Sequence, residues 1–153
     1  MFRFLLCLFL LSPFFISAQD RVGKTRTEIK KQLDSWKTEN RSLSPVITDA
    51  ATTTILTIKD PANGMVKFIY TFNKSKLCTS EKTVVTNDSV RTNLLNMVLE
   101  QSVHEWKKIN GNQYISKFSD KLMIEIPAKP TDHSFTIYKA DWTKEVYDML
   151  NRK

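Results

Sequence analysis

The side chains best suited to chemistry in this sequence include two histidines, and the first lies in a predicted helix. His104 and Glu105 match the first two positions of the His-Glu-x-x-His motif of zinc proteases. Lys108 stands where the second histidine is required, so the imidazole pair that binds zinc from one helix face is missing. Glu100, one turn earlier, could chelate a metal with His104, but we interpret the two as an exposed helical pair worth about 0.2–0.5 kcal/mol. His133 is interpreted as a solvated loop residue.

Cys78 is the candidate thiol nucleophile. It lies in the strand-like segment Leu77–Ser80, where no helix N-terminus lowers the pKa of a thiol. We therefore expect a buried, inert cysteine; a reactive thiol and an intermolecular disulfide are the alternatives. A cluster of Cys78, His104 and a carboxylate would instead favour an enzyme of unrecognised type.

Motifs for acyl transfer or nucleotide binding are missing from the sequence. It contains no Gly-x-Ser-x-Gly, no glycine-rich phosphate loop and only three glycines, which disfavours loops whose backbone must approach a phosphate closely. We assign no catalytic, cofactor-binding or metal-ligating residue and expect no cofactor. The expected class is a non-enzymatic domain.

Residues 1–18 have the composition of a secretory signal peptide. An apolar run, Phe4–Leu11, follows one basic residue, and small residues precede the predicted cleavage site before Gln19. The run is shorter than the about 18–20 apolar residues of a transmembrane helix. Cys7 has no small residue before it, so lipidation there is disfavoured. We expect a secreted or periplasmic protein with one domain over residues 19–153.

Positive charge bears on the choice of partner. The chain has a formal net charge of +7, which favours anionic partners, but its basic residues form no run of five or more and are interpreted as a solvated surface. Basic residues flank Phe68 and Tyr70, as they would on a nucleic-acid-stacking sheet. Both aromatics share a strand face with Val66 and Phe72, so we assign them to the core and expect no nucleic acid. The expected partner is another envelope or extracellular macromolecule; oligomeric state is left open.

Apolar periodicity predicts an α+β domain with elements in the order α-βββ-α-βββ-α. The predicted segments are a helix from a Thr25–Glu28 capping box to beyond Trp36, strands over Thr52–Lys59, Met65–Phe72 and Leu77–Val85, a helix from Asn87 or Ser89 through Trp106 towards Gly111, strands over Tyr114–Phe118, Leu122–Ile126 and Phe135–Tyr138, and a short helix from Asp141. Strands with one apolar side favour one antiparallel meander sheet with helices on one face. Two halves, 24–86 and 88–140, share this order, which indicates either a tandem duplication or a common α+β alternation.

The N-terminal part of the predicted domain carries a family resemblance. It begins Val22-Gly23-Lys24-Thr25-x-x-Glu28-Ile29, continues to Tyr70-Thr-Phe72-Asn73 and then reaches Cys78. This pattern resembles small exported bacterial domains of largely unassigned function whose fold is similar to that of the β-lactamase inhibitor protein. The helix start is also similar to that of outer-membrane assembly lipoproteins, although the chain lacks their lipidated cysteine and the Gly-x-Pro after that helix. The resemblance implies a non-catalytic protein-binding domain.

The sequence therefore leaves two functions of different classes open. The first is a domain that binds another macromolecule through an exposed sheet face or its turns. The alternative is a small-ligand or lipid-binding domain, which would need an apolar cavity of a few hundred Å³, roughly, between sheet and helices.

Overall fold

The computed structural model describes residues 21–60, 64–129 and 131–151, so the predicted signal peptide lies outside the described residues. Three helices of eight or more residues, two short 3₁₀ helices and eight strands follow one another in this part of the chain. Their order is α2 (Arg26–Glu39), the 3₁₀ helix η2 (Arg41–Leu43), β1 (Val46–Asp49), β2 (Thr53–Asp60), β3 (Gly64–Phe72), β4 (Cys78–Val85), α3 (Asp88–Leu99), the 3₁₀ helix η3 (Ser102–His104), β5 (Lys107–Asn110), β6 (Gln113–Ile115), β7 (Leu122–Glu125), β8 (Ser134–Lys139) and α4 (Lys144–Asn151).

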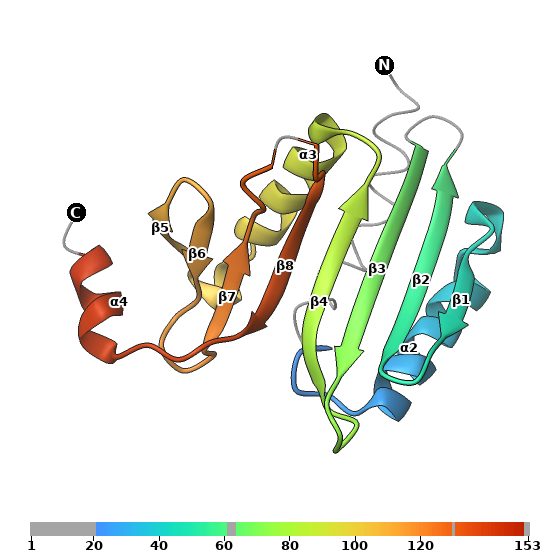
Figure 1. The fold of residues 1–153 in the computed structure, drawn as a ribbon, viewed down its shortest axis with the longest axis horizontal. Helices are drawn as coiled ribbons and strands as arrows, with labels where there is room; N and C mark the ends of the chain where they lie inside the picture. The colour runs from blue at the N-terminus through green and yellow to red at the C-terminus, as the bar shows by residue number, and fades with distance from the viewer. Residues whose placement is uncertain (1–20, 61–63, 130, 152–153) are drawn as a thin grey trace.

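The strands form one antiparallel sheet of eight, which confirms the α+β class. Its strand order is β1-β2-β3-β4-β8-β7-β6-β5, so two four-stranded meanders meet where β4 pairs with β8 (Figure 1). All seven strand pairings are antiparallel. Every helix in the described part of the chain is too short or too polar to cross a lipid bilayer.

The prediction of three strands in each half is wrong, because each half has four. The strands that sequence analysis missed, β1 and β5, are the two edges of the sheet. Each is four residues long, and nearly all of its side chains are exposed or half-buried without alternation. An edge strand of this kind carries no period-two apolar signal.

Helix α2 begins as predicted. The Thr25 hydroxyl accepts the backbone N–H of Glu28, and the Glu28 carboxylate accepts the backbone N–H of Thr25, which completes the capping box. Ile29, Leu33 and Trp36 follow on one face and are buried. Asn87 caps α3 without a capping box: its side-chain oxygen accepts the backbone N–H of Val90 at 2.9 Å.

Helix α3 ends earlier than predicted. Its last residue is Leu99, and Glu105 then adopts a left-handed conformation with φ of +49° before the chain enters β5. The apolar period that continues to Val103 and Trp106 is therefore coincidental, and Val103 is 60% exposed. Lys107 and Lys108, which fall within the predicted helix, belong to the edge strand.

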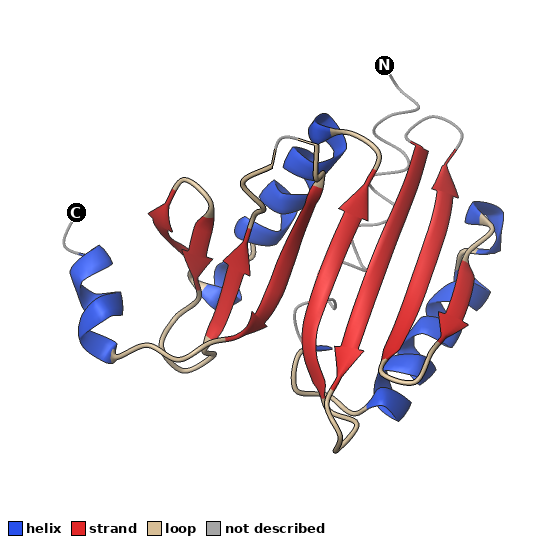
Figure 2. Ribbon diagram, viewed as in Figure 1, coloured by secondary structure: helices blue, strands red, loops and turns tan. Residues whose placement is uncertain are grey.

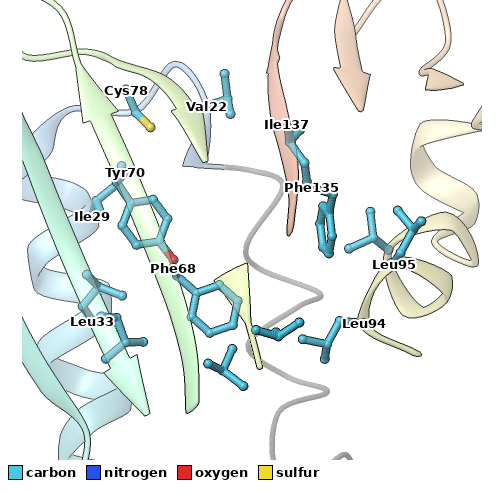
Figure 3. Close-up of a cluster of buried hydrophobic side chains, with 14 of the residues drawn as sticks. Val22, Ile29, Leu33, Phe68, Tyr70, Cys78, Leu94, Leu95, Phe135 and Ile137 are labelled. Atoms are coloured by element: carbon cyan, nitrogen blue, oxygen red, sulfur yellow. The ribbon is translucent and has the colours of Figure 1, made fainter. Parts of the chain in front are cut away.

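The main core lies between the sheet and helices α2 and α3, which both pass behind the sheet in Figure 2. Phe68 and Tyr70 are completely buried, as the sequence predicted. Burying one large apolar side chain stabilises a fold by about 1.5–3 kcal/mol. Figure 3 shows the two parts of this core, formed by Ile29, Leu33, Phe68 and Tyr70 and by Leu94, Leu95, Phe135 and Ile137.

The position of helix α4 contradicts the prediction that all helices lie on one face of the sheet. Tyr114 and Ile124 form a cross-strand pair that packs on the main core, whereas the next pair, Ile115 and Met123, belongs to a second cluster with Trp142. Successive strand residues point to opposite faces. The second cluster, and with it α4, therefore lies on the face opposite α2 and α3, beside β5–β7.

Candidate functional site

One face of the sheet is left uncovered by the described helices from β2 to β8. We call it the open face and define it as the side chains of these strands that point away from α2 and α3. None belongs to either apolar cluster, and Figure 2 shows these strands with no helix in front of them. By strand alternation the open face comprises Thr53, Ile55, Thr57, Lys59, Met65, Lys67, Ile69, Thr71, Ser80, Lys82, Val84, Ser134, Thr136 and Tyr138.

Strand register places the open-face side chains in rows. Ile55 pairs with Ile69, Ile69 with Lys82, and Lys82 with Thr136, so one row crosses four strands. Side chains in such a row have Cβ atoms about 4.5–5.5 Å apart. All four are half-buried, so they present a flat, partly apolar surface to solvent.

Lysines give the open face its charge. Lys59, Lys67 and Lys82 all point to this side of β2–β4, and no carboxylate is found among the side chains described there. The Lys82 amine lies 3.6 Å from a carboxylate oxygen of Asp132 at the rim. Lys67 makes no ion pair with a described residue. On the neighbouring strand β7, Glu125 pairs with Thr136, and its carboxylate accepts a hydrogen bond of 3.1 Å from the Tyr138 hydroxyl. The positive charge therefore lies on the β2–β4 part of the face, with aliphatic side chains between the lysines.

A buried polar cluster lies on the opposite, core side of β3 and β4. Glu81 is 1% exposed and pairs with Tyr70 across the strands. Arg21 is 2% exposed; its guanidinium donates a hydrogen bond to the Tyr70 hydroxyl and lies 5.3 Å from the centroid of that ring. Burial raises the pKa of the Glu81 carboxyl to about 7, although the charge of Arg21 opposes the rise. Glu81 Oε2 has no hydrogen-bond partner in the structure as described.

Cys78 is the buried strand cysteine that the sequence predicted. It is 2% exposed, and its sulfur lies 3.5 Å from the carbonyl oxygen of Ser80. Burial, with a smaller contribution from the Glu81 carboxylate, raises the pKa of the thiol to about 12. Thiolate is the nucleophilic form, so this cysteine is inert at neutral pH.

His104 has a different carboxylate partner from the one proposed. Glu100 closes α3 and is exposed, so the predicted helical pair of Glu100 and His104 is not formed. Instead His104, 6% exposed, has its Nδ1 atom 2.8 Å from Oδ2 of Asp120. The separation of 16 residues between His104 and Asp120 gives no signal in the sequence. Cys78 and His104 thus have different acidic neighbours, Glu81 and Asp120.

His133 lies in a loop as predicted but is not fully solvated. It is half-buried, and its Nδ1 atom lies 3.5 Å from Oδ1 of Asp88. No group of three or more histidine, cysteine, aspartate and glutamate side chains suited to a metal ion occurs in residues 21–60, 64–129 and 131–151.

Two of the cavities lined by described residues bear on ligand binding. One, of about 310 Å³, is lined by Val22, Val103, His104, Ser119, Asp120, Leu122 and Lys139. The other, of about 460 Å³, is lined by residues 110–113 and 125–128. Each has charged or amide side chains in its wall, so neither is the apolar cavity that a lipid-binding domain needs.

Comparison with protein-family models, with curated proteins and with solved structures finds no match for this chain. The resemblance to exported domains of the β-lactamase inhibitor fold stays a prediction. The proposed function is therefore based on the geometry of the chain itself.

Proposed function

We propose that this protein is an exported, non-enzymatic domain that binds another protein through the open face of its sheet. The observation that carries the proposal is that the helices cover the face behind β2, β3, β4 and β8 and leave the other face uncovered. That surface is partly apolar, with hydroxyl and ammonium groups among its aliphatic side chains.

The size of the open face suits a protein partner. Four strands spaced about 4.8 Å apart, with eight residues of about 3.4 Å each, cover about 19 Å by about 27 Å. The projected area of about 500 Å² is a large part of the about 800 Å² that one partner contributes to a standard interface. No small molecule would use so flat a surface, because small-molecule sites are concave.

The charge of the open face defines the chemistry of its partner. Lys67 and Lys82 each lie next to both Ile69 and Val84, and Lys59 lies opposite Met65 near the end of β2. A protein surface with acidic side chains around an apolar centre would complement this arrangement, and electrostatic complementarity speeds association and suppresses wrong partners. The proposed partner is therefore an acidic protein of the same extracytoplasmic compartment.

We infer export from the composition of residues 1–18, and N-terminal sequencing tests it separately from partner binding. N-terminal sequencing of the protein recovered outside the cytoplasm should begin at Gln19. Recovery of the whole chain from the cytoplasm, still beginning at Met1, would contradict export.

We also propose that the two halves are a tandem duplication. Each half runs helix, 3₁₀ helix and four strands, and the strand order is symmetric about the β4–β8 pair. Both 3₁₀ helices end at a left-handed residue, Ser44 with φ of +47° and Glu105 with φ of +49°. This arrangement agrees with the tandem helix-plus-meander units of the β-lactamase inhibitor fold.

Comparative affinity capture tests the proposed function. The purified protein and its Lys67→Glu/Lys82→Glu variant are used to capture proteins from the native envelope or culture fluid. The control, Lys31→Glu/Lys37→Glu, makes the same change of charge at two exposed positions of α2. We expect one acidic protein to be captured by wild type and control and lost from the open-face variant. A partner retained equally by all three proteins, or only co-purifying lipid, would contradict the proposal.

A further inference from the structure

The two edges of the sheet differ in how well they are protected against pairing with a further strand. Edge strand β5 contains Lys107 and Lys108, its register with β6 shifts between Lys108 and Asn110, and helix α4 packs beside it. Lysines, register irregularities and covering helices are devices by which natural sheets block edge-to-edge pairing. The β5 edge has all three.

Edge strand β1 has none of these three devices. Its segment, Val46–Asp49, contains no lysine and no proline, and its register with β2 is regular. Among the described strands, β2 is its only neighbour, so its other side ends the sheet (Figure 1). We propose that this free edge pairs with the β1 strand of a second copy of the chain, which makes the protein a symmetric dimer.

The hydrogen bonds between β1 and β2 show which backbone groups of β1 point outward. Ala50 donates its N–H to the carbonyl of Thr53 at 2.9 Å. Opposed residues in an antiparallel pair alternate between bonded and non-bonded positions, so the even-numbered residues of β1 bond to β2. The N–H and C=O groups of Ile47 and Asp49 therefore point away from β2, towards the free edge.

This spacing of outward groups makes β1 complementary to itself. When two β1 strands run antiparallel with Thr48 opposite Thr48, Ile47 of each copy faces Asp49 of the other, and each such pair exchanges both of its backbone hydrogen bonds. Moving the centre to Ile47 would bring in Pro45, which has no N–H to donate. Moving it to Asp49 would place two carboxylates opposite each other, which is destabilising. The register centred on Thr48 is therefore the favoured one.

The side chains of the open-face side agree with this register. Val46 is 52% exposed, an unusual state for a large apolar side chain of this sheet. In the dimer it faces Ala50 of the second copy and gains an apolar neighbour. The two Thr48 side chains face each other in a non-hydrogen-bonded position, where threonine pairs stabilise a sheet.

The charges on the helix side of β1 also permit the pairing. The Asp49 carboxylate is already paired with Arg26 at 3.1 Å and with Lys30 at 2.5 Å. In the dimer Asp49 faces Ile47 of the second copy and not a like charge. No buried, unpaired charge is created when the two edges meet.

Pairing at β1 joins the open faces of the two copies. Val46 pairs with Thr57 and Thr48 with Ile55, and both β2 residues belong to the open face, so the four side chains point to the same side of the sheet. The dimer thus offers one continuous surface across both copies. Its formation does not depend on the proposed acidic partner, and the tests below use the protein alone.

Disulfide trapping tests the register. Exported, purified Thr48→Cys is oxidised with diamide and analysed on a non-reducing gel. The Cα atoms of a non-hydrogen-bonded pair lie about 4.5 Å apart, within the range that a disulfide spans, so we expect a covalent dimer. Val46→Cys should stay monomeric, because in this register its two copies lie beyond the limit of about 7 Å.

Two controls accompany the trapping experiment. Wild type should stay monomeric, because the Cys78 side chain is buried. Ile109→Cys places an exposed thiol on the protected edge strand β5 and should also stay monomeric. Crosslinking of Val46→Cys or Ile109→Cys as readily as Thr48→Cys would overturn the proposal.

Sedimentation equilibrium measures the pairing without a crosslink. An edge of four residues buries less surface than a standard interface. We therefore expect a weak dimer with a Kd on the order of 0.1 mM, and an average mass that rises towards two chains between about 10 µM and about 1 mM. Thr48→Lys places like charges opposite each other and should weaken the dimer about tenfold. Ile109→Lys, the matched change on β5, should dimerise as wild type does.

The sedimentation data can also refute the pairing. The proposal is overturned if wild type stays monomeric up to about 1 mM, ten times the expected Kd. It is equally overturned if Thr48→Lys dimerises as tightly as wild type, because the interface would then lie elsewhere. Failure of affinity capture at the open face would leave both of these results unchanged.

Discussion

The buried carboxylate of Glu81 makes a specific prediction about how the stability of this protein depends on pH. The pKa of this group is about 7 in the folded protein, against an ordinary value of 4.5, because burial disfavours the charged form. Arg21 opposes the rise without cancelling it. We predict that Glu81→Gln, which keeps the shape and stays neutral, stabilises the protein at pH 8 and has little effect at pH 4.5.

The sign and magnitude follow from proton linkage. Between pH 4.5 and pH 7 the folded state holds the proton of Glu81 while the unfolded state releases it, so stability falls as the pH rises through this window. The shift of about 2.5 pKa units, at about 1.4 kcal/mol each, corresponds to about 3 kcal/mol. Glu81 is 1% exposed, so solvent screening requires no large discount. Below pH 4.5 both states are protonated and the contribution is constant.

Urea unfolding followed by tryptophan fluorescence measures the effect at several pH values from 4.5 to 8. The difference in free energy of unfolding between wild type and Glu81→Gln isolates this carboxyl from other groups that titrate. Glu100→Gln, at an exposed position, is the control and should follow wild type. The reasoning is refuted if the Glu81→Gln and wild-type curves stay parallel across the whole pH range.

Three further predictions concern the ion pairs, the thiol and the core. Lys30, with help from Thr54 and Arg26, lowers the pKa of Asp49 from 3.8 to about 2; the stability from this group is present above pH 3.8 and lost as the pH falls to about 2. Because the Asp49 side chain is 34% exposed, Asp49→Asn should cost only about 1 kcal/mol at pH 7 in urea unfolding, and a cost above 3 kcal/mol would be inconsistent with this screening. The Cys78 thiol should resist iodoacetamide in the folded protein and react fully in denaturant, as measured by mass; rapid modification of the folded protein would show an accessible thiolate. Leu94→Ala should destabilise the protein by about 2–5 kcal/mol in the same urea assay, and a loss below 1 kcal/mol would place Leu94 outside the core.

The elements that could be predicted are those with a strong local signal. Helix α2 has a capping box and an apolar stripe, and β3 has a large apolar or aromatic residue at every second position from Val66 to Phe72. By contrast, β1 and β5 are short edge strands without alternation, and the premature end of α3 is decided by the left-handed turn at Glu105. The position of α4 on the opposite face depends on the pairing of β6 with β7, which no local pattern reports.

The residues of the candidate sites also divide into those with a local sequence signal and those without one. The burial of Cys78 and Phe68 follows from strand patterning alone. Glu81 carried a usable signal, because strand alternation puts it on the same side as Thr83 and Val85, two buried positions. Asp120 carried none, since its contact with His104 depends on how the β6–β7 turn packs against η3.

Site-specific photo-crosslinking in the native host tests the use of the open face most directly. A photoreactive amino acid is placed at position 57, on β2 of the open face, or at position 31, on the exposed side of α2. The account predicts a crosslinked adduct with one acidic protein from position 57 and none from position 31. An adduct formed only from position 31, or none from position 57 in folded, exported protein, would contradict binding through the open face.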